Sequence, residues 1–263
     1  MDLQLSNKLA LVSGSTAGIG LAIATALARE GARVIVNGRT QAAVDSAIAS
    51  IKHETGADAL GFAGDLSKAE VAEALAVRYP DVEIVVNNLG IFEPKAFEEI
   101  PDEDWQRFFD VNVLSGVRLA RLYLPAMKAA NWGRIIFISS ESGVQIPTEM
   151  IHYGVTKTAL LGVSRGLAEA VAGTGITVNS VLPGPTRSRG VGDFVDTLAK
   201  STGQSFEEFE TAFFDKVRPT SLIKRFASPE EVAAMVTYVA SPLASATTGA
   251  ALRVDGGVIK SAF

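Results

Sequence analysis

Short apolar runs rich in β-branched residues alternate with longer amphipathic segments along the whole chain. The runs predict seven strands, at Ala10–Ser13, Val34–Asn37, Leu60–Ala63, Ile84–Asn87, Ile135–Ser139, Thr177–Leu182 and Ala251–Val254. Each run is almost continuously apolar, which is typical of parallel strands that are covered by helices on both faces.

The segments between these runs have the length and pattern of helices. We expect helices at Ile19–Glu30, Gln41–Thr55, Asp104–Ala130, Tyr153–Ala172 and Pro229–Ala240. Repeated strand–helix alternation predicts a doubly wound parallel β-sheet, the three-layer α/β/α Rossmann fold. No linker or low-complexity segment interrupts it, so we expect residues 1–263 to form a single domain.

One connection between a predicted strand and a predicted helix is much longer than the others. Gly184–Pro219 joins a strand to the last helix over roughly 35 residues, far more than an ordinary connection in such folds. It contains Phe194, Phe206, Phe209, Phe213 and Phe214. Because ligands bind at the carboxyl ends of strands in these sheets, we interpret residues 185–219 as a lid or substrate loop. An extra helix pair, with the aromatic residues as a local core, is a compatible alternative.

Composition excludes several kinds of site. The net charge is −5 and no basic run is present, which argues against nucleic-acid binding. The absence of cysteine excludes disulfides and thiolate chemistry, and two histidines cannot form a multi-histidine metal site. Glycines interrupt the apolar stretch Leu9–Ala28, so we expect neither a signal peptide nor a membrane span, and a cytoplasmic location.

A glycine-rich turn follows the first predicted strand. Gly14-Ser15-Thr16-Ala17-Gly18-Ile19-Gly20 leads directly into an apolar helix. Glycines allow the backbone to approach a pyrophosphate, and the helix N-terminus offers free N–H groups and a positive dipole end. The turn therefore predicts a dinucleotide site, although a plain strand–helix turn also needs small residues.

The end of the second strand bears on the choice of cofactor. A carboxylate here usually binds a free ribose 2′-hydroxyl, whereas an arginine accommodates a 2′-phosphate. This chain has Asn37, Gly38 and Arg39. Arg39 favours NADP(H) over NAD(H), and a merely solvated arginine is the alternative.

Tyr153 and Lys157 are four residues apart at the start of a predicted helix, so they share one helix face. A lysine at that distance favours the phenolate, and we expect it to lower the pKa of Tyr153. Ser140 ends a strand shortly before them and is placed to hydrogen-bond a reacting carbonyl oxygen, with Ser139 as its competitor. Asn112 lies in an apolar helix, where its amide needs either a special role or buried partners.

Together these residues resemble the short-chain dehydrogenase/reductase family, in its single-domain branch, over essentially the whole chain. The motifs occur in the family's order: Gly14-x-x-x-Gly18-x-Gly20, Asn87-Asn88-Leu89-Gly90, Asn112, Ser140, Tyr153-x-x-x-Lys157, Asn179 and Pro183-Gly184. Any one motif is weak evidence, but the ordered set is strong.

The resemblance implies the catalytic roles. Tyr153 is the general acid and base, Lys157 holds the nicotinamide ribose and assists Tyr153, Ser140 orients the substrate oxygen, and Asn112 supports a proton-relay water. Ser140 is preferred to Ser139 because the family's serine usually stands thirteen residues before the tyrosine.

The resemblance also implies the cofactor contacts. Asp65 is expected at the adenine, Asn88 and Gly90 on the adenosine side, and Thr186 or Ser188 at the carboxamide. The full predicted set is Gly14, Ser15, Thr16, Gly18, Ile19, Gly20, Asn37, Arg39, Asp65, Leu66, Asn88, Gly90, Tyr153, Lys157, Pro183, Gly184, Thr186 and Ser188. No metal is expected.

Four positions depart from the family pattern or are open to two interpretations. Ser13 stands where threonine is frequent and keeps the hydroxyl, whereas Leu89 replaces a usual alanine and puts the adenosine-side contacts in doubt. Glu141 either meets a polar substrate group or is solvated. His152 is expected to point away from the site and to be structural.

The resulting prediction is an NADP(H)-dependent oxidoreductase that interconverts a ketone and a secondary alcohol, similar to 3-oxoacyl-thioester (3-oxoacyl-ACP) reductases. An NAD-dependent alcohol, polyol or steroid-type dehydrogenase is the alternative, and a non-catalytic dinucleotide sensor is a third reading that the intact Ser140, Tyr153 and Lys157 disfavour. Family members are commonly homotetramers, so we expect a homotetramer or homodimer that uses the long helices and the C-terminal segment.

Overall fold

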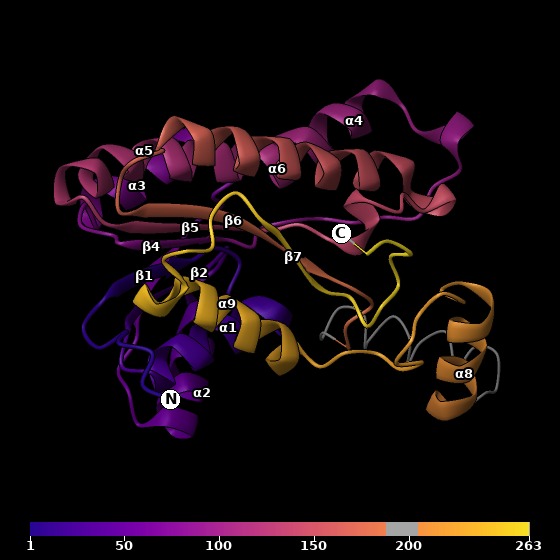
Figure 1. The fold of residues 1–263 in the computed structure, drawn as a ribbon, viewed down its shortest axis with the longest axis horizontal. Coiled ribbons are helices and arrows are strands. Elements are labelled where there is room, and N and C mark those ends of the chain that lie inside the picture. Colours follow the sequence, from indigo (N-terminus) through magenta and orange to yellow (C-terminus); the bar gives the residue numbers. More distant parts are fainter. Residues whose placement is uncertain (188–204, 263) are drawn as a thin grey trace.

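The computed structural model describes residues 1–187 and 205–262, and its centre is one seven-stranded parallel sheet (Figure 1). The strands are β1 (Leu9–Val12), β2 (Arg33–Gly38), β3 (Leu60–Ala63), β4 (Ile84–Asn87), β5 (Gly133–Ile138), β6 (Ile176–Pro183) and β7 (Ala251–Val254). Their order is β3-β2-β1-β4-β5-β6-β7. The predicted doubly wound sheet is confirmed, and all seven predicted strands are present.

The strand order reverses between β1 and β4, which are neighbours in the sheet. Val12 of β1 pairs with Val36 of β2 on one side and with Val86 of β4 on the other. This is the topological switch point, where the loops leaving adjacent strands diverge and open a crevice for a ligand.

Helices cover both faces of the sheet (Figure 1). One face carries α1 (Gly18–Arg29), α2 (Gln41–Thr55) and α9 (Pro229–Ala240), and the other carries α3 (Ala69–Arg78), α4 (Asp102–Phe109), α5 (Ser115–Ala130) and α6 (Ile151–Ala170). The sequence pattern did not predict α3. The single helix expected over Asp104–Ala130 is instead α4 and α5, joined by a π-helical turn at Asp110–Leu114.

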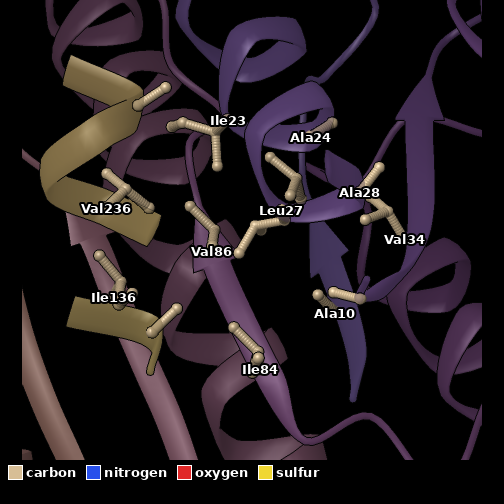
Figure 2. Packing of buried hydrophobic residues seen from close by; sticks show 14 of the residues in the cluster. Ala10, Ile23, Ala24, Leu27, Ala28, Val34, Ile84, Val86, Ile136 and Val236 are labelled. Carbon is tan, nitrogen blue, oxygen red and sulfur yellow. The ribbon is translucent and has the colours of Figure 1, made fainter. Parts of the chain in front are cut away.

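Each face has its own hydrophobic core. On the α1 side, Ile23 and Leu27 pack toward Val86 of the sheet and Val236 of α9 (Figure 2). On the other side, buried residues of α5 and α6 pack on the same strands. No helix in the described ranges is long and apolar enough to cross a membrane.

The predicted lid region contains a helix, α8 (Phe206–Lys216), that begins with a capping box between Ser205 and Glu208. In Figure 1 it stands apart from the helices that cover the sheet. Its aromatic residues form a small separate core with Phe226: Phe206, Phe209, Phe213 and Phe214. The expected local core is therefore present. Phe194 and Ser188 lie outside the described residues, and closure of residues 185–219 as a lid stays a prediction.

Candidate active site

A cleft of about 940 Å³ opens at the carboxyl ends of the central strands. Its walls come from β5, β6, α6, α8 and the loop after β4. Nine residues predicted from the sequence line it: Ile19, Asn88, Gly90, Ser140, Tyr153, Lys157, Pro183, Gly184 and Thr186. The topology thus brings together motifs that are far apart in the chain.

Tyr153 and Lys157 lie one turn apart on α6, and both face the cleft. The Lys157 Nζ donates to the carbonyl of Ile138 over 2.9 Å and lies 5.5 Å from the centre of the Tyr153 ring. Phe92 packs edge-on against that ring, with ring centres 6.3 Å apart. The helix α6 therefore presents a phenol and an ammonium group to the same cleft.

Burial sets the protonation of both groups. It lowers the pKa of Lys157 to about 8, because an ammonium ion is poorly solvated inside the protein. Burial also raises the pKa of Tyr153 to about 12, and the hydroxyl of Ser140 opposes this only in part. The expectation of a lowered Tyr153 pKa was wrong for this structure, since desolvation of the phenolate outweighs the Ser140 hydrogen bond and the charge of Arg218, which lower the pKa.

The two serines at the end of β5 have different hydrogen bonds. Ser139 donates to the carbonyl of Lys157 over 2.8 Å, so its hydroxyl ties the strand to α6. The Ser140 hydroxyl accepts from the backbone N–H of Ser142 over 3.1 Å, and its proton is left for another partner. Ser140 is therefore the serine that can donate into the cleft.

Asn112 is buried in the π-helical turn and clamps the loop after β4. Its Oδ1 accepts from the N–H of Ile91 over 2.7 Å, and its Nδ2 donates to the carbonyl of Ile91 and to the hydroxyl of Thr156. Thr156 in turn donates to the carbonyl of Tyr153. The amide is thus a satisfied buried group that connects the loop to α6. Its proposed role in a proton relay stays a prediction.

The glycine-rich turn needs its glycines for conformation and for space. Gly14 and Gly18 have φ of +61° and +55°, in the left-handed region that disfavours other residues. A Cβ at Gly20 would lie 2.4 Å from the carbonyl oxygen of Gly14 and 2.5 Å from the Nδ2 of Asn88. In the described part of the chain, no side chain caps the N-terminus of α1 and its first turn has no acid.

Several residues that were predicted to contact the cofactor use their side chains to hold the glycine-rich turn in place. Asn37 accepts from the N–H of Gly14 and donates to the carbonyls of Phe62 in β3 and Gly64 just after it. The buried Ser15 hydroxyl bonds to β1 and β2. Asn88 donates to the carbonyls of Ser13 and Gly14. Leu66 is buried in the second core. The side chains of Asn37, Ser15 and Leu66 are thus used within the protein, and the contact of these residues with a cofactor stays a prediction.

Arg39 and Asp65 lie at the outer end of the cofactor region. Arg39 is exposed at the end of β2, and a Cβ at the preceding Gly38 would clash with Thr16 of the turn. Burial disfavours the charge of Asp65, but hydrogen bonds from Ser67 and the charges of Lys68 and Arg39 outweigh it and lower its pKa. Arg39 is therefore close to both the turn and Asp65.

The segment after β6 is held closely against the C-terminal strand. Gly184 donates to Val254, and a Cβ at Gly184 would lie 2.6 Å from the carbonyl oxygen of Asp255. The buried Thr186 donates its hydroxyl proton to the carbonyl of Gly184 over 2.9 Å. Between the two candidates for a carboxamide contact, only Thr186 lies among the described residues.

The other positions that stood out in the sequence have clear partners. The Ser13 hydroxyl accepts from the N–H groups of Asn88 and Leu89, so it shapes the loop after β4. Leu89 packs against the second core. His152 is fully buried against Phe108, with ring centres 4.0 Å apart, which agrees with a structural role.

The structure supports neither of the two interpretations of Glu141 that the sequence offered. It is neither solvated nor free for a substrate, because its carboxylate accepts from Nε of Arg218 over 2.9 Å, and its side chain is 4% exposed. Arg218 also contacts Glu149, and burial of the guanidinium is outweighed by these two carboxylates, which raise its pKa. Sequence reasoning missed Arg218 and Glu149. A partner 77 positions from Glu141 leaves no local signal.

Comparison with protein families and curated proteins gives consistent results. The family model described as enoyl-(acyl carrier protein) reductase matches residues 14–259. The uncharacterized oxidoreductase YvaG of Bacillus subtilis is 49% identical over 265 residues, covering 100% of both chains. D-beta-hydroxybutyrate dehydrogenase of Cupriavidus necator is 35% identical and covers 96% of this chain and 98% of its own.

A solved structure agrees with the same relationship. L-sorbose reductase from Gluconobacter frateurii, complexed with NADPH and L-sorbose, superposes with a TM-score of 0.93. It is 34% identical, and the match covers 99% of this chain and 100% of that one.

Proposed function

Because the chain belongs to the short-chain dehydrogenase/reductase family, whose oxidoreductases act on alcohol and ketone groups with NAD(P), we propose that it reduces a ketone to a secondary alcohol with NADP(H), or runs the reverse reaction. The observation that carries the proposal is the convergence of Ser140, Tyr153 and Lys157 on one cleft.

The residues present fit a dinucleotide. The uncapped N-terminus of α1 presents free N–H groups beside a turn that has no room for side chains, which suits a pyrophosphate. The backbone of Gly14–Gly20 would hold it, and Thr186 would meet the carboxamide. When bound, the nicotinamide supplies or accepts the hydride.

Arg39 supports NADP(H) as the cofactor. It is exposed and lies beside the turn, and no carboxylate occupies the end of β2 where a free ribose would be bound. Its guanidinium suits the geometry of a phosphate. The G. frateurii relative was solved with NADPH, which agrees with this choice. NAD(H) is the competing cofactor.

The catalytic side chains divide the proton chemistry. Ser140 donates a hydrogen bond to the carbonyl oxygen and stabilises the negative charge that develops there. Tyr153, with a pKa of about 12, holds its proton at neutral pH and transfers it to the forming alkoxide, which is a stronger base. The nearby Lys157 ammonium favours the resulting phenolate.

The cleft supports a partly apolar substrate. Its walls include Ile91, Phe92, Met150, Phe209 and Phe213. A 3-oxoacyl thioester fits this description, as do shorter ketones. The two relatives with named substrates differ in type, one a hydroxybutyrate dehydrogenase and the other a sorbose reductase, so the family alone does not select among them.

The proposal is tested by initial rates of NADPH oxidation with an acetoacetyl thioester and a panel of ketones, each repeated with NADH. Tyr153→Phe is the control for enzyme-dependent turnover. Tyrosine-dependent rates with NADPH support the proposal, and a thioester among the best substrates supports the acyl-reductase form. Absence of tyrosine-dependent rates with every ketone and both cofactors would exclude it.

Assembly as a homotetramer through the long helices is part of the proposal. Phe109 and Leu114, at the junction of α4 and α5, are both 37% exposed, which is compatible with an interface there. Mass measurement by light scattering of the purified protein distinguishes a tetramer from a dimer or monomer.

A further inference from the structure

Three charged side chains that are not among the proposed catalytic residues form a cluster in the wall of the cleft. Arg218 lies two residues beyond α8, and its Nε donates to Oε1 of Glu141 over 2.9 Å. Its Nη1 donates to Oε1 of Glu149 over 3.1 Å and to the carbonyl of Val217 over 3.0 Å. All three charged residues line the cleft.

The cluster is costly to bury and lies in apolar surroundings. The side chains of Arg218 and Glu141 are 11% and 4% exposed, while Phe92, Met150 and Phe209 line the same space. The attraction within a buried ion pair often only offsets the desolvation of its two ions, so stability is a weak reason for such a pair. A role in binding accounts for it better.

Two residues of the cluster that line the cleft have unused hydrogen-bonding groups. Within residues 1–187 and 205–262, Nη2 of Arg218 and Oε2 of Glu149 have no hydrogen-bond partner. The Glu149 side chain is 42% exposed. A guanidinium N–H donates and a carboxylate accepts, whereas an alcohol hydroxyl can do both. The pair is therefore matched to hydroxyl groups.

The cluster is close to the reacting atoms. Glu141 directly follows Ser140, and Glu149 precedes Tyr153 by four residues. The charges of Glu141 and Arg218 also act on Tyr153, the first raising its pKa and the second lowering it. Arg218 and Glu149 line the same cleft as Ser140 and Tyr153, so a substrate whose carbonyl meets these two residues shares the cleft with the charged cluster.

We propose that Arg218 and Glu149 form a polar subsite that binds substrate hydroxyl groups near the reacting carbonyl, and that Glu141 holds Arg218 in position. The inference rests on the proposed function, because it needs a ketone at Tyr153. The cluster has two carboxylates and one guanidinium, so an acidic substrate meets excess negative charge there. Among the ketones that the cleft can hold, a neutral polyhydroxy ketone of the ketose type is the class that would use this subsite.

The test compares matched substrates with and without hydroxyl groups. We would measure kcat/KM with NADPH for ketohexoses and ketopentoses against 2-hexanone and 2-pentanone, and take the ratio of each pair. Wild type is expected to prefer the hydroxylated partner. Glu149→Ala is expected to lower that ratio by about tenfold or more, the usual effect of losing a hydrogen bond to a charged group. Glu149→Gln keeps an accepting oxygen and should recover part of it.

A control variant separates the subsite from the general effect of removing an exposed carboxylate. Glu207→Ala removes an exposed carboxylate of α8 that does not line the cleft, and it should leave both rates unchanged. Loss of the ratio in Glu149→Ala, with partial recovery in Glu149→Gln, supports the subsite. A wild type without preference for hydroxylated ketones, or an unchanged ratio in Glu149→Ala, overturns it and leaves the proposed function standing. No oxidation of NADPH or NADH with any ketone overturns both.

Discussion

The hydroxyl of Ser139 donates to the backbone carbonyl of Lys157 over 2.8 Å, across the junction between β5 and α6. This bond fixes the helix that carries Tyr153 against the end of β5, just before Ser140. It also uses the proton of Ser139. Two adjacent serines therefore have separate tasks, one in positioning the helix and the other in contact with the cleft.

Substitution of the two serines should separate these tasks. Ser140→Ala removes the hydroxyl that can donate to the carbonyl oxygen, and we expect kcat to fall by about 10²- to 10³-fold. Ser139→Ala removes a buried hydrogen bond, and we expect most activity to remain while the free energy of unfolding falls by about 1 kcal/mol. Steady-state kinetics and urea unfolding of both variants measure this. The reverse assignment, with Ser139→Ala the inactive variant, would show that we chose the wrong serine.

Tyr153→Phe tests the proton donor. The variant keeps the ring and its edge contact with Phe92 but has no proton to transfer. We expect kcat to fall by about 10²- to 10⁴-fold, the range for loss of a general acid. NADPH binding, followed by its fluorescence, serves as the control because the variant leaves the glycine-rich turn at Gly14–Gly20 unchanged. Retention of more than a tenth of the activity would contradict the assigned role.

Arg39→Ala tests the choice of cofactor. If Arg39 binds the 2′-phosphate, the variant loses a charge-assisted contact, and KM for NADPH should rise by roughly 10- to 100-fold. KM for NADH should change little, because that cofactor has no such phosphate. Arg33→Ala, an exposed arginine at the opposite end of β2, is the matched control. Equal changes with both cofactors would remove Arg39 from the cofactor site.

The buried Lys157 predicts a pH dependence. Burial lowers its pKa to about 8, so its charge is present below that pH and lost above it. We expect kcat/KM for NADPH in the reduction to decline above about pH 8, because this parameter reports groups of the free enzyme. Lys157→Arg stays charged to much higher pH. In any variant that retains activity, the decline should move upward. A wild-type profile that is flat to pH 9.5 would contradict the assignment.

The strands and most helices were predictable because they depend on local pattern. A parallel strand that is buried on both faces is a continuous apolar run, and all seven runs became strands. The missed helix α3 shows the limit. It buries only Ala72 and Leu75, so its apolar stripe is too thin to stand out from the charged residues around it.

Only the site residues that belong to recognisable sequence motifs were predictable. Ser140, Tyr153 and Lys157 line one cleft as expected. The roles of Asn37 and Ser15 could not be foreseen, because their side chains turn inward to hold the glycine turn. The pKa of Tyr153 depends on burial by distant segments. The contact of Glu141 with Arg218 could not be predicted for the same reason, because Arg218 follows α8 and is 77 positions from Glu141 in the sequence.

His152 provides a stability test that is independent of catalysis. Both ring nitrogens are buried without a hydrogen-bond partner in the described structure, and the ring packs against Phe108 and Trp105. Burial lowers the pKa of His152, although the charges of Asp104 and Glu93 oppose this. The neutral imidazole therefore fits the core, and the charged form does not.

Acidification should destabilise the wild type through this histidine. Below the unfolded-state pKa of about 6.5, the unfolded chain binds a proton that the folded chain refuses. Its contribution to stability is therefore complete above about pH 6.5 and is lost as the pH falls toward the folded pKa, by at most about 1.4 kcal/mol per pH unit. His152→Phe keeps an aromatic ring but cannot titrate. Urea unfolding from pH 8 to pH 5 should show a steeper loss of stability in wild type than in the variant. Parallel curves would mean that His152 is protonated in the folded protein at the same pH as in the unfolded chain.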